Sequence, residues 1–282
     1  MSALRIDLAD KDTDLAEARL PVLALHGTAS SGCQWQGLSD HLRGSYRVFA
    51  PNLPGYGNAR LYGTRDIRDT AEGVISTIVA GSGPMHLVGH SHGAAVALEI
   101  AIQRPDLVRS LTLIEPAIYH LLQSGSASDL ALASNLSSLS DWMAASIAAD
   151  LPAAGMRAYV DFWYGAGAWD RTSSALRQNL MRDTERVTSD FAESLAKSWP
   201  ASRFGRVKCQ TLVMMALESN VVGLRISEMV AEAIPGARLV MVPEAGHMAQ
   251  LTDPRVTTPL IAAHLRFVDR FRSTSPSHRR AH

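Results

Sequence analysis

The sequence predicts an α/β fold, with a mostly parallel sheet, helices on both faces and a helical insertion. Short continuous apolar runs bounded by Gly, Pro or His alternate with longer amphipathic stretches. Strands buried on both faces are apolar throughout, and strand–helix alternation builds a parallel sheet. The alternation stops between residues 117 and 204, where helical periods occur and no convincing strand does. We therefore expect a core formed by residues 1–116 and 205–272, interrupted by a helical cap at 117–204.

The expected elements follow from these two patterns. The apolar runs predict strands at Pro21–Leu25, Arg47–Ala50, Met85–Val88, Leu111–Ile114, Thr211–Met215 and Arg238–Val242. The amphipathic periods predict core helices at Ile67–Ala80, Ala94–Gln103, Leu224–Ile234 and Val256–Phe271. Ten aromatic residues fall in the cap interval, which indicates a small core of its own. The polar, basic segment at 273–282 is predicted to be a disordered tail.

Composition excludes several classes of function. The 282 residues carry 27 Lys and Arg against 27 Asp and Glu, so the chain lacks the basic field that nucleic-acid binding requires. Cys33 and Cys209 form neither a disulfide framework nor a metal-ligand spacing. The first 20 residues contain no secretory signal, and no apolar run is long enough to span a membrane. We expect a cytoplasmic protein with a small-molecule substrate; the oligomeric state, a homo-oligomer included, stays open.

One segment carries a catalytic signature. Residues 85–98, MHLVGHSHGAAVAL, place Gly-x-Ser-x-Gly between an apolar strand and an Ala-rich helix. In that context the pattern holds the serine on a strained turn, where Gly89 and Gly93 avoid collisions with the neighbouring strand and helix. Ser91 is therefore the predicted nucleophile.

A serine nucleophile needs a base and donors for the oxyanion. His247, in EAGHM, follows a predicted strand and precedes the last helix, at the carboxyl edge where open α/β sheets bind ligands. The backbone N–H of His92, after the nucleophile, is one expected oxyanion donor. Thr28, in the HGT segment after the first strand, is expected to supply the other.

Taken in order, these segments resemble the α/β-hydrolase family over nearly the whole chain. The resemblance rests on LALHGT, APNLPGYGNAR, LVGHSHG, a helical cap, TLVMMALES and VPEAGHMAQ. It implies a Ser–acid–His triad with the cap closing over the active site.

The acid departs from the commonest family pattern. That pattern places an Asp just after the strand at Thr211–Met215, where this chain has Ser219 beside Glu218. Other members take the acid from the end of the strand after the nucleophile helix, where this chain has Glu115, followed by Pro116. A serine cannot balance the charge of an imidazolium, so Glu115 is the predicted acid and Glu218 the alternative.

The remaining polar and aromatic candidates have weaker support. We expect His26 to shape the oxyanion loop and to contribute to substrate binding, together with Trp142, Trp163 and Trp169 of the cap. The aromatic cap residues fit either a helix packed on the core or a hydrophobic wall above Ser91. We expect His90 to be a packed structural residue. The histidines expected at the surface are His41, His86, His264, His278 and His282.

No metal or cofactor is predicted, because the ligand spacings and phosphate-binding glycine loops are missing from the sequence. A metal site formed by His26, His90, His92 and His120 is disfavoured on the same ground. The leading hypothesis is a serine hydrolase of an ester, thioester or lactone, acting through an acyl-enzyme. The alternative is a cofactor-free dioxygenase of a heteroaromatic substrate, because such members of the fold also carry His-Ser-His at the turn; a binding protein without catalysis is disfavoured by Ser91 and His247.

Overall fold

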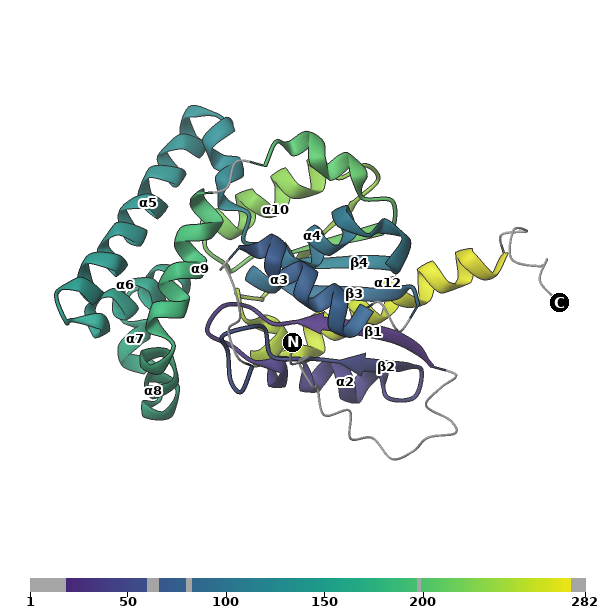
Figure 1. Cartoon of the computed structure of the whole chain (residues 1–282), viewed down its shortest axis with the longest axis horizontal. Helices are drawn as coiled ribbons and strands as arrows, with labels where there is room; N and C mark the ends of the chain where they lie inside the picture. The colour runs from purple at the N-terminus through teal and green to yellow at the C-terminus, as the bar shows by residue number, and fades with distance from the viewer. Residues whose placement is uncertain (1–18, 60–65, 80–82, 197–198, 275–282) are drawn as a thin grey trace.

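The computed structural model describes residues 19–59, 66–79, 83–196 and 199–274 and is built on one parallel sheet (Figure 1). Its six strands lie in the order β2-β1-β3-β4-β5-β6, and every neighbouring pair is parallel. The strands are β1 (Leu20–Leu25), β2 (Tyr46–Phe49), β3 (Met85–His90), β4 (Val108–Ile114), β5 (Gln210–Ala216) and β6 (Arg238–Val242). This arrangement confirms the predicted α/β fold class.

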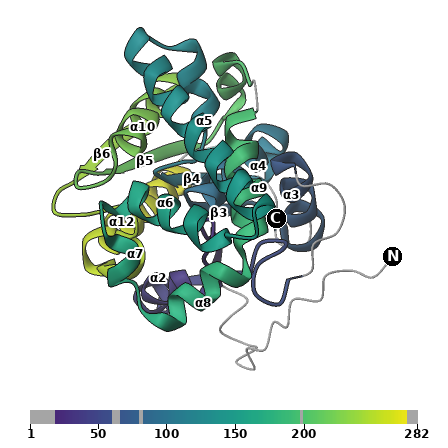
Figure 2. The same cartoon turned by 90° about the vertical axis from the view of Figure 1, so that its left-hand side faces the viewer.

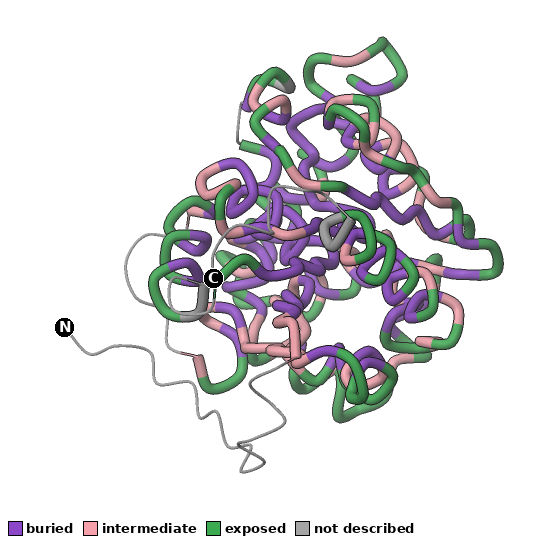
Figure 3. The backbone as a smooth tube through the Cα atoms, turned by 90° about the vertical axis from the view of Figure 1, so that its right-hand side faces the viewer, coloured by how far each residue is buried: buried purple, intermediate pink, exposed green. Residues whose placement is uncertain are grey.

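Alternate residues of the strands face two separate cores. Leu23, Leu25 and Leu87 point to the core that contains α3 (Ile67–Val74), α4 (His92–Gln103) and α10 (Val221–Ala233). Val22, Ala24 and Val88 point to the core formed with α2 (Gln36–Leu42) and α12 (Pro254–Thr274). Both faces of the sheet are thus covered over its central strands, which explains why their sequences are continuously apolar. Edge strand β6 departs from the expected burial, because Leu239 and Met241 are exposed. In Figure 3 the buried backbone runs through this interior, while the exposed stretches lie around its outside.

The predicted cap interval is helical. Between β4 and β5 the chain forms η4 (Tyr119–Ser124), α5 (Ala127–Ala148), α6 (Pro152–Tyr164), α7 (Ala168–Arg171), α8 (Ser174–Arg182), α9 (Thr184–Ala196) and η5 (Ala201–Arg206). Figure 2 shows α6 and α9 lying in front of the end of the sheet. The remaining elements are η1 (Gly32–Trp35), the π-helical turn η2 (Ile75–Val79), η3 (Pro105–Leu107) and α11 (Ala249–Thr252).

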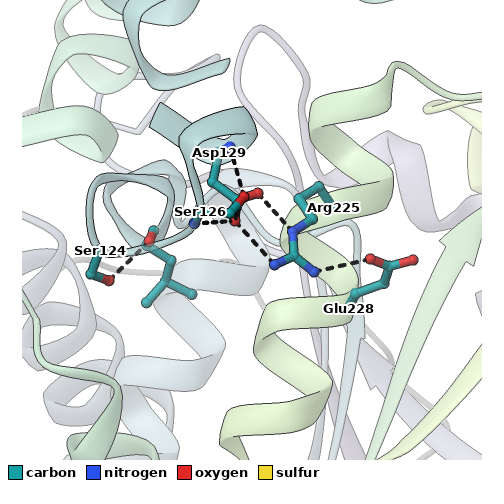
Figure 4. A network of polar contacts seen from close by, with 6 residues as sticks. Ser124, Ser126, Asp129, Arg225 and Glu228 are labelled. Atoms are coloured by element: carbon teal, nitrogen blue, oxygen red, sulfur yellow. Dashed lines mark hydrogen bonds and ion pairs between the residues drawn. The ribbon is translucent and has the colours of Figure 1, made fainter. Parts of the chain in front are cut away.

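A partly buried ion pair between Asp129 and Arg225 joins the cap to core helix α10 (Figure 4). Ser126 caps α5 and exchanges hydrogen bonds with Asp129, whose carboxylate also accepts from Arg225 Nε at 2.7 Å and from Nη2 at 3.1 Å. The hydrogen bond from Arg225 holds the pKa of Asp129 well below its ordinary value. Because two guanidinium nitrogens bind the same carboxylate, the pair fixes direction as well as distance.

Three expectations need correction or lie outside the structure. His86 and His264 were expected at the surface, but both are buried at the face that α12 covers, whereas His41 is exposed. Helix α12 extends to Thr274, so the first two residues of the predicted tail are helical. The rest of the tail, with His278 and His282, lies outside the described residues. None of the helices in the described ranges is long and apolar enough to cross a membrane.

Candidate active site

Ser91 occupies a strained turn between β3 and α4. Its φ and ψ are 50° and −117°, a conformation that costs a non-glycine residue about 1–3 kcal/mol. A side chain at Gly93 would place Cβ 2.3 Å from the Leu25 carbonyl oxygen, and one at Gly89 would lie 2.5 Å from Ala94 Cα. The glycines therefore permit the turn, which presents the Ser91 side chain at the carboxyl edge of the sheet.

Glu115 and His247 form a buried pair at the same edge. Glu115 Oε2 lies 2.5 Å from His247 Nδ1, and both side chains are almost fully buried. The other carboxylate oxygen, Oε1, accepts a hydrogen bond from Ala216 N–H at 3.0 Å. The Ser219 hydroxyl donates to Oε2 at 2.7 Å. Because a carboxylate oxygen can only accept, the hydrogen of this contact lies on His247 Nδ1, and Nε2 is the ring nitrogen that Glu115 does not engage.

Glu218, the alternative acid, is placed differently. Its side chain is exposed, and its backbone N–H donates to the Ala245 carbonyl at 2.8 Å. The structure thus brings Glu115, and not Glu218, against His247.

The expected oxyanion donors lie next to Ser91. A Cβ built on Gly27 would fall 3.2 Å from Ser91 Cβ, so the loop that continues into Thr28 packs directly on the nucleophile turn. Helix α4 begins at His92, and the first N–H groups of a helix lack acceptors within it. The structure thus places the Thr28 loop and the first turn of α4 next to Ser91.

The His26 ring is hydrogen-bonded to the loop that contains Gly27 and Thr28. Its Nδ1 donates to the Gly27 carbonyl at 2.8 Å, and its Nε2 accepts from Leu53 N–H at 2.9 Å. Burial lowers the pKa of His26 to about 4, which fits the neutral tautomer that these two bonds require. The side chain is fully buried, and these two hydrogen bonds fix it against the loop; its predicted contact with substrate stays a prediction.

Aromatic side chains cover the pair from the cap. The Trp163 ring stacks on His247, with ring centroids 4.9 Å apart and planes at 18°. Tyr119, just beyond β4, lies 5.7 Å from Trp163, and its hydroxyl faces the Ser91 side chain. Phe191 of α9 packs 5.7 Å from Tyr119. Sequence reasoning missed Tyr119 as a site residue, although its position shortly after Glu115 places it at the same sheet edge.

The other predicted tryptophans lie elsewhere on the cap. Trp142 is 54% exposed, and Trp169 is buried. Together they line a groove of about 440 Å³ between α5, α6 and α7, and Ala153, Ala154, Arg157, Ala158 and Asp161 form the rest of its wall. Of the three tryptophans predicted to bind substrate, the structure thus brings Trp163 to His247.

A second polar cluster connects the nucleophile turn to the cap. Asp190 of α9 is fully buried and accepts a hydrogen bond from Tyr56 at 2.6 Å. Its carboxylate also pairs with Arg186 at 2.8 Å and lies 3.9 Å from His92 Nε2. The imidazole of His92 is therefore directed toward the cap. Sequence analysis did not single out Asp190 or Arg186, because polar residues on an amphipathic helix are normally solvated.

His90 is buried beneath the site, with its ring centroid 4.6 Å from that of His247. Burial lowers the pKa of His90 well below its ordinary value, so this ring stays neutral beside the candidate base. No hydrogen bond joins Ser91 Oγ to His247 across the described residues, and such bonds often tighten when substrate binds. In the same ranges, His, Cys, Asp and Glu side chains form no group of three or more that could hold a metal ion.

Backbone strain collects at this edge. Five non-glycine residues of the described chain have positive φ: Ala29, Ser91, Glu115, Asp150 and Glu244. All except Asp150 lie in loops that follow a strand at the carboxyl edge. Strain of this kind persists where surrounding structure enforces it, and it is common at functional sites.

Comparisons with known proteins identify the family and the fold. The alpha/beta hydrolase family profile matches residues 22–259. Lipase LipV of Mycobacterium tuberculosis is 36% identical over 34% of this chain and 37% of its own length. The putative carbamate hydrolase RutD of Variovorax paradoxus is 28% identical over 83% of this chain and 87% of its own length. A pimeloyl-[acyl-carrier protein] methyl ester esterase of Methylococcus capsulatus is 36% identical over 33% of this chain and 35% of its own length.

The matches to the lipase and the methyl ester esterase thus span about a third of those proteins. Solved structures extend the likeness to the whole fold. An esterase from Thermogutta terrifontis superposes with a TM-score of 0.68 at 20% identity, covering 88% of this chain and 90% of that one. An enol-lactonase from Burkholderia xenovorans gives a TM-score of 0.66 at 17% identity over 88% and 92%. The chain belongs to the α/β-hydrolase family.

Proposed function

We propose that this α/β hydrolase is a cofactor-free serine hydrolase that cleaves an ester, thioester or lactone of a small, partly hydrophobic substrate. The observation that carries the proposal is the 2.5 Å contact between Glu115 and His247 at the sheet edge that presents Ser91. The three residues supply a nucleophile, a base and a carboxylate to orient the base. The reaction would pass through an acyl-enzyme on Ser91.

The proposed chemistry assigns a direction to each proton. Glu115 holds the Nδ1–H of His247, so Nε2 takes the proton of Ser91 as Oγ attacks the carbonyl carbon. The same proton then passes to the leaving alkoxide or thiolate. Water, deprotonated by Nε2, attacks the acyl-enzyme; as the bond to Ser91 Oγ breaks and the acid leaves, Nε2 returns that proton to Oγ. Throughout, the negative charge of Glu115 stabilises the imidazolium that forms between these steps.

The tetrahedral intermediates need donors for their oxyanion. The amides of Thr28 and His92 are suited to this role, because the loop packs on Ser91 and α4 begins at His92. Preorganised N–H groups in a buried site stabilise developing charge without reorganising during the reaction.

The aromatic side chains around the site favour a substrate with a hydrophobic group. Trp163, Tyr119 and Phe191 cover the site with apolar surface, while the Tyr119 hydroxyl adds one polar contact near Ser91. The names of the relatives, which include a lipase, a methyl ester esterase and an enol-lactonase, favour carboxylic ester or lactone bonds.

A fluorophosphonate probe with mass mapping of the adduct tests the proposal. Ser91 should carry the adduct, and Ser91→Ala should lower hydrolysis of an activated aryl ester by at least about 10³-fold. Ser227→Ala is the matched control, because that buried hydroxyl binds the Gly223 carbonyl and lies on α10. If Ser91→Ala keeps near-wild-type turnover of the substrate, Ser91 does not attack the substrate carbonyl. That result would favour the dioxygenase hypothesis.

A further inference from the structure

Ser219 occupies the position at which the commonest family pattern has the acid. In this chain its hydroxyl binds Glu115, the predicted acid. Its hydroxyl donates to Glu115 Oε2 at 2.7 Å, the same oxygen that faces His247 Nδ1. The Ala216 amide holds the second oxygen. With both oxygens engaged, the carboxylate cannot rotate away from the imidazole without losing a charge-assisted hydrogen bond.

The next residue, Asn220, contacts the cap. Its Oδ1 accepts from Val222 N–H at 2.9 Å and caps α10, while its Nδ2 donates to the Phe162 carbonyl at 2.7 Å. Phe162 directly precedes Trp163, whose ring stacks on His247. The amide of Asn220 thus ties the start of α10 to the segment that covers the imidazole.

We propose that the Ser219–Asn220 dipeptide is a positioning device that holds the His247 imidazole on two sides. Ser219 fixes the Glu115 carboxylate that binds the edge of the imidazole. Asn220 fixes the segment that carries Trp163, whose ring stacks on the face of the imidazole. Neither side chain touches the reacting atoms, so both are positioning residues. The proposal rests on the triad proposed above, and it adds the residues that keep that triad in its productive geometry.

A double-mutant cycle with an activated aryl ester tests the role of Ser219. Ser219→Ala should lower kcat about tenfold with KM changed less than twofold, and Ser219→Thr, which retains the hydroxyl, should recover activity to within about threefold. In a Glu115→Gln background, Ser219→Ala should cost less than twofold, because its effect passes through the carboxylate. Ser227→Ala controls for loss of a buried hydroxyl on α10.

Asn220→Ser tests the second side. A serine at position 220 can still accept the N-terminal hydrogen bond of α10, so this helix should stay folded. Its shorter side chain cannot reach the Phe162 carbonyl, so that hydrogen bond is lost. We expect kcat to fall about threefold in the wild-type background and to stay unchanged in a Trp163→Phe background. A loss of the same size in both backgrounds would remove Asn220 from the proposal.

The outcomes separate this inference from the proposed function. An equal loss for Ser219→Ala in the wild-type and Glu115→Gln backgrounds, or no loss in either, overturns the positioning role. Fluorophosphonate labelling of Ser91 provides the second readout. If wild-type Ser91 takes no label, the proposed function fails and the positioning role falls with it. If Ser91 is labelled at the same rate in wild type and in Ser219→Ala, only the positioning role fails.

Discussion

The two edges of the sheet each hold a buried histidine beside a carboxylate. At the carboxyl edge His247 meets Glu115, and at the amino edge His86 of β3 lies 3.3 Å from Asp269 of α12. The difference lies in what else each histidine contacts. His86 Nδ1 is also bonded to the Ser110 hydroxyl at 2.7 Å, so both of its nitrogens are engaged, whereas the geometry at Glu115 leaves Nε2 of His247 for a reacting group.

The carboxylates differ in the same way. Asp269 accepts from Tyr46 at 2.7 Å and from Arg109 at 2.6 Å, so a guanidinium balances its charge. Glu115 receives neutral donors from Ser219 and Ala216, and its charge remains available to stabilise a protonated His247. A His–carboxylate pair by itself therefore does not mark a catalytic site. In the triad that we propose, the pair at the carboxyl edge is distinguished by a ring nitrogen that the acid does not engage and by a carboxylate without a cation beside it among the described residues.

The largest expected effect separates the two pairs by activity. Glu115→Gln keeps the shape of the side chain but removes the charge that orients and stabilises the imidazolium, so turnover should fall by at least about 10³-fold. Glu218→Gln, at an exposed carboxylate nearby, should cost less than threefold. Steady-state hydrolysis of an activated aryl ester measures both. The reverse ranking would assign the acid to Glu218.

Asp269→Asn should have the opposite profile. It leaves Arg109 without its carboxylate and weakens three contacts between α12 and the sheet, so the free energy of unfolding should fall by about 1–3 kcal/mol. Turnover, measured well below the unfolding transition, should stay within threefold of wild type. Urea unfolding gives the first quantity. A large loss of turnover in a folded Asp269→Asn protein would contradict a purely structural amino edge.

The pH dependence of stability sharpens this contrast. Burial alone would raise the pKa of Asp269, but hydrogen bonds from His86, Tyr46 and Arg109 hold it well below its ordinary value. A carboxyl whose pKa is lower in the folded state stabilises the protein above its unfolded pKa of about 4 and loses that contribution as the pH falls further. The difference in unfolding free energy between wild type and Asp269→Asn should therefore shrink below about pH 4. A difference that is constant from pH 7 to pH 3 would contradict this account.

Much of the fold and part of the site could be predicted because they depend on local patterns. Continuous apolar runs identified the strands, and Gly89–Gly93 identified the turn at Ser91, since only glycine fits the two positions beside it. The choice between Glu115 and Glu218 stayed open, because it depends on which side chain a loop directs inward. Glu115 has a positive φ, a conformation that a glycine at this position would have suggested but a glutamate does not.

The errors have a similar origin. His86 and His264 were assigned to the surface from their polarity, but α12 crosses the amino edge and supplies Asp269 as a partner for His86. Long-range pairing of this kind leaves no local pattern. The same holds for Ser219, whose hydrogen bond to Glu115 joins positions far apart in the chain.

A smaller effect than that of Glu115→Gln tests how tightly the acid is enclosed. A Cβ on Gly223 of α10 would lie 3.0 Å from Glu115 Oε2 and 3.2 Å from Ser219 Oγ, close enough to displace one of them by a few tenths of an ångström. Gly73 of α3 is the matched control, because a Cβ there meets nothing within 4 Å.

Replacing glycine by alanine within a helix stabilises the fold by about 0.5–1 kcal/mol, so both variants should remain folded. Gly223→Ala should nevertheless lower kcat about three- to tenfold, while Gly73→Ala should leave it unchanged. Thermal unfolding and turnover measured on the same samples would separate the two quantities. Unchanged turnover in Gly223→Ala would mean that the Glu115 carboxylate tolerates movement, and that its contact with His247 is less constrained than the three donors around it imply.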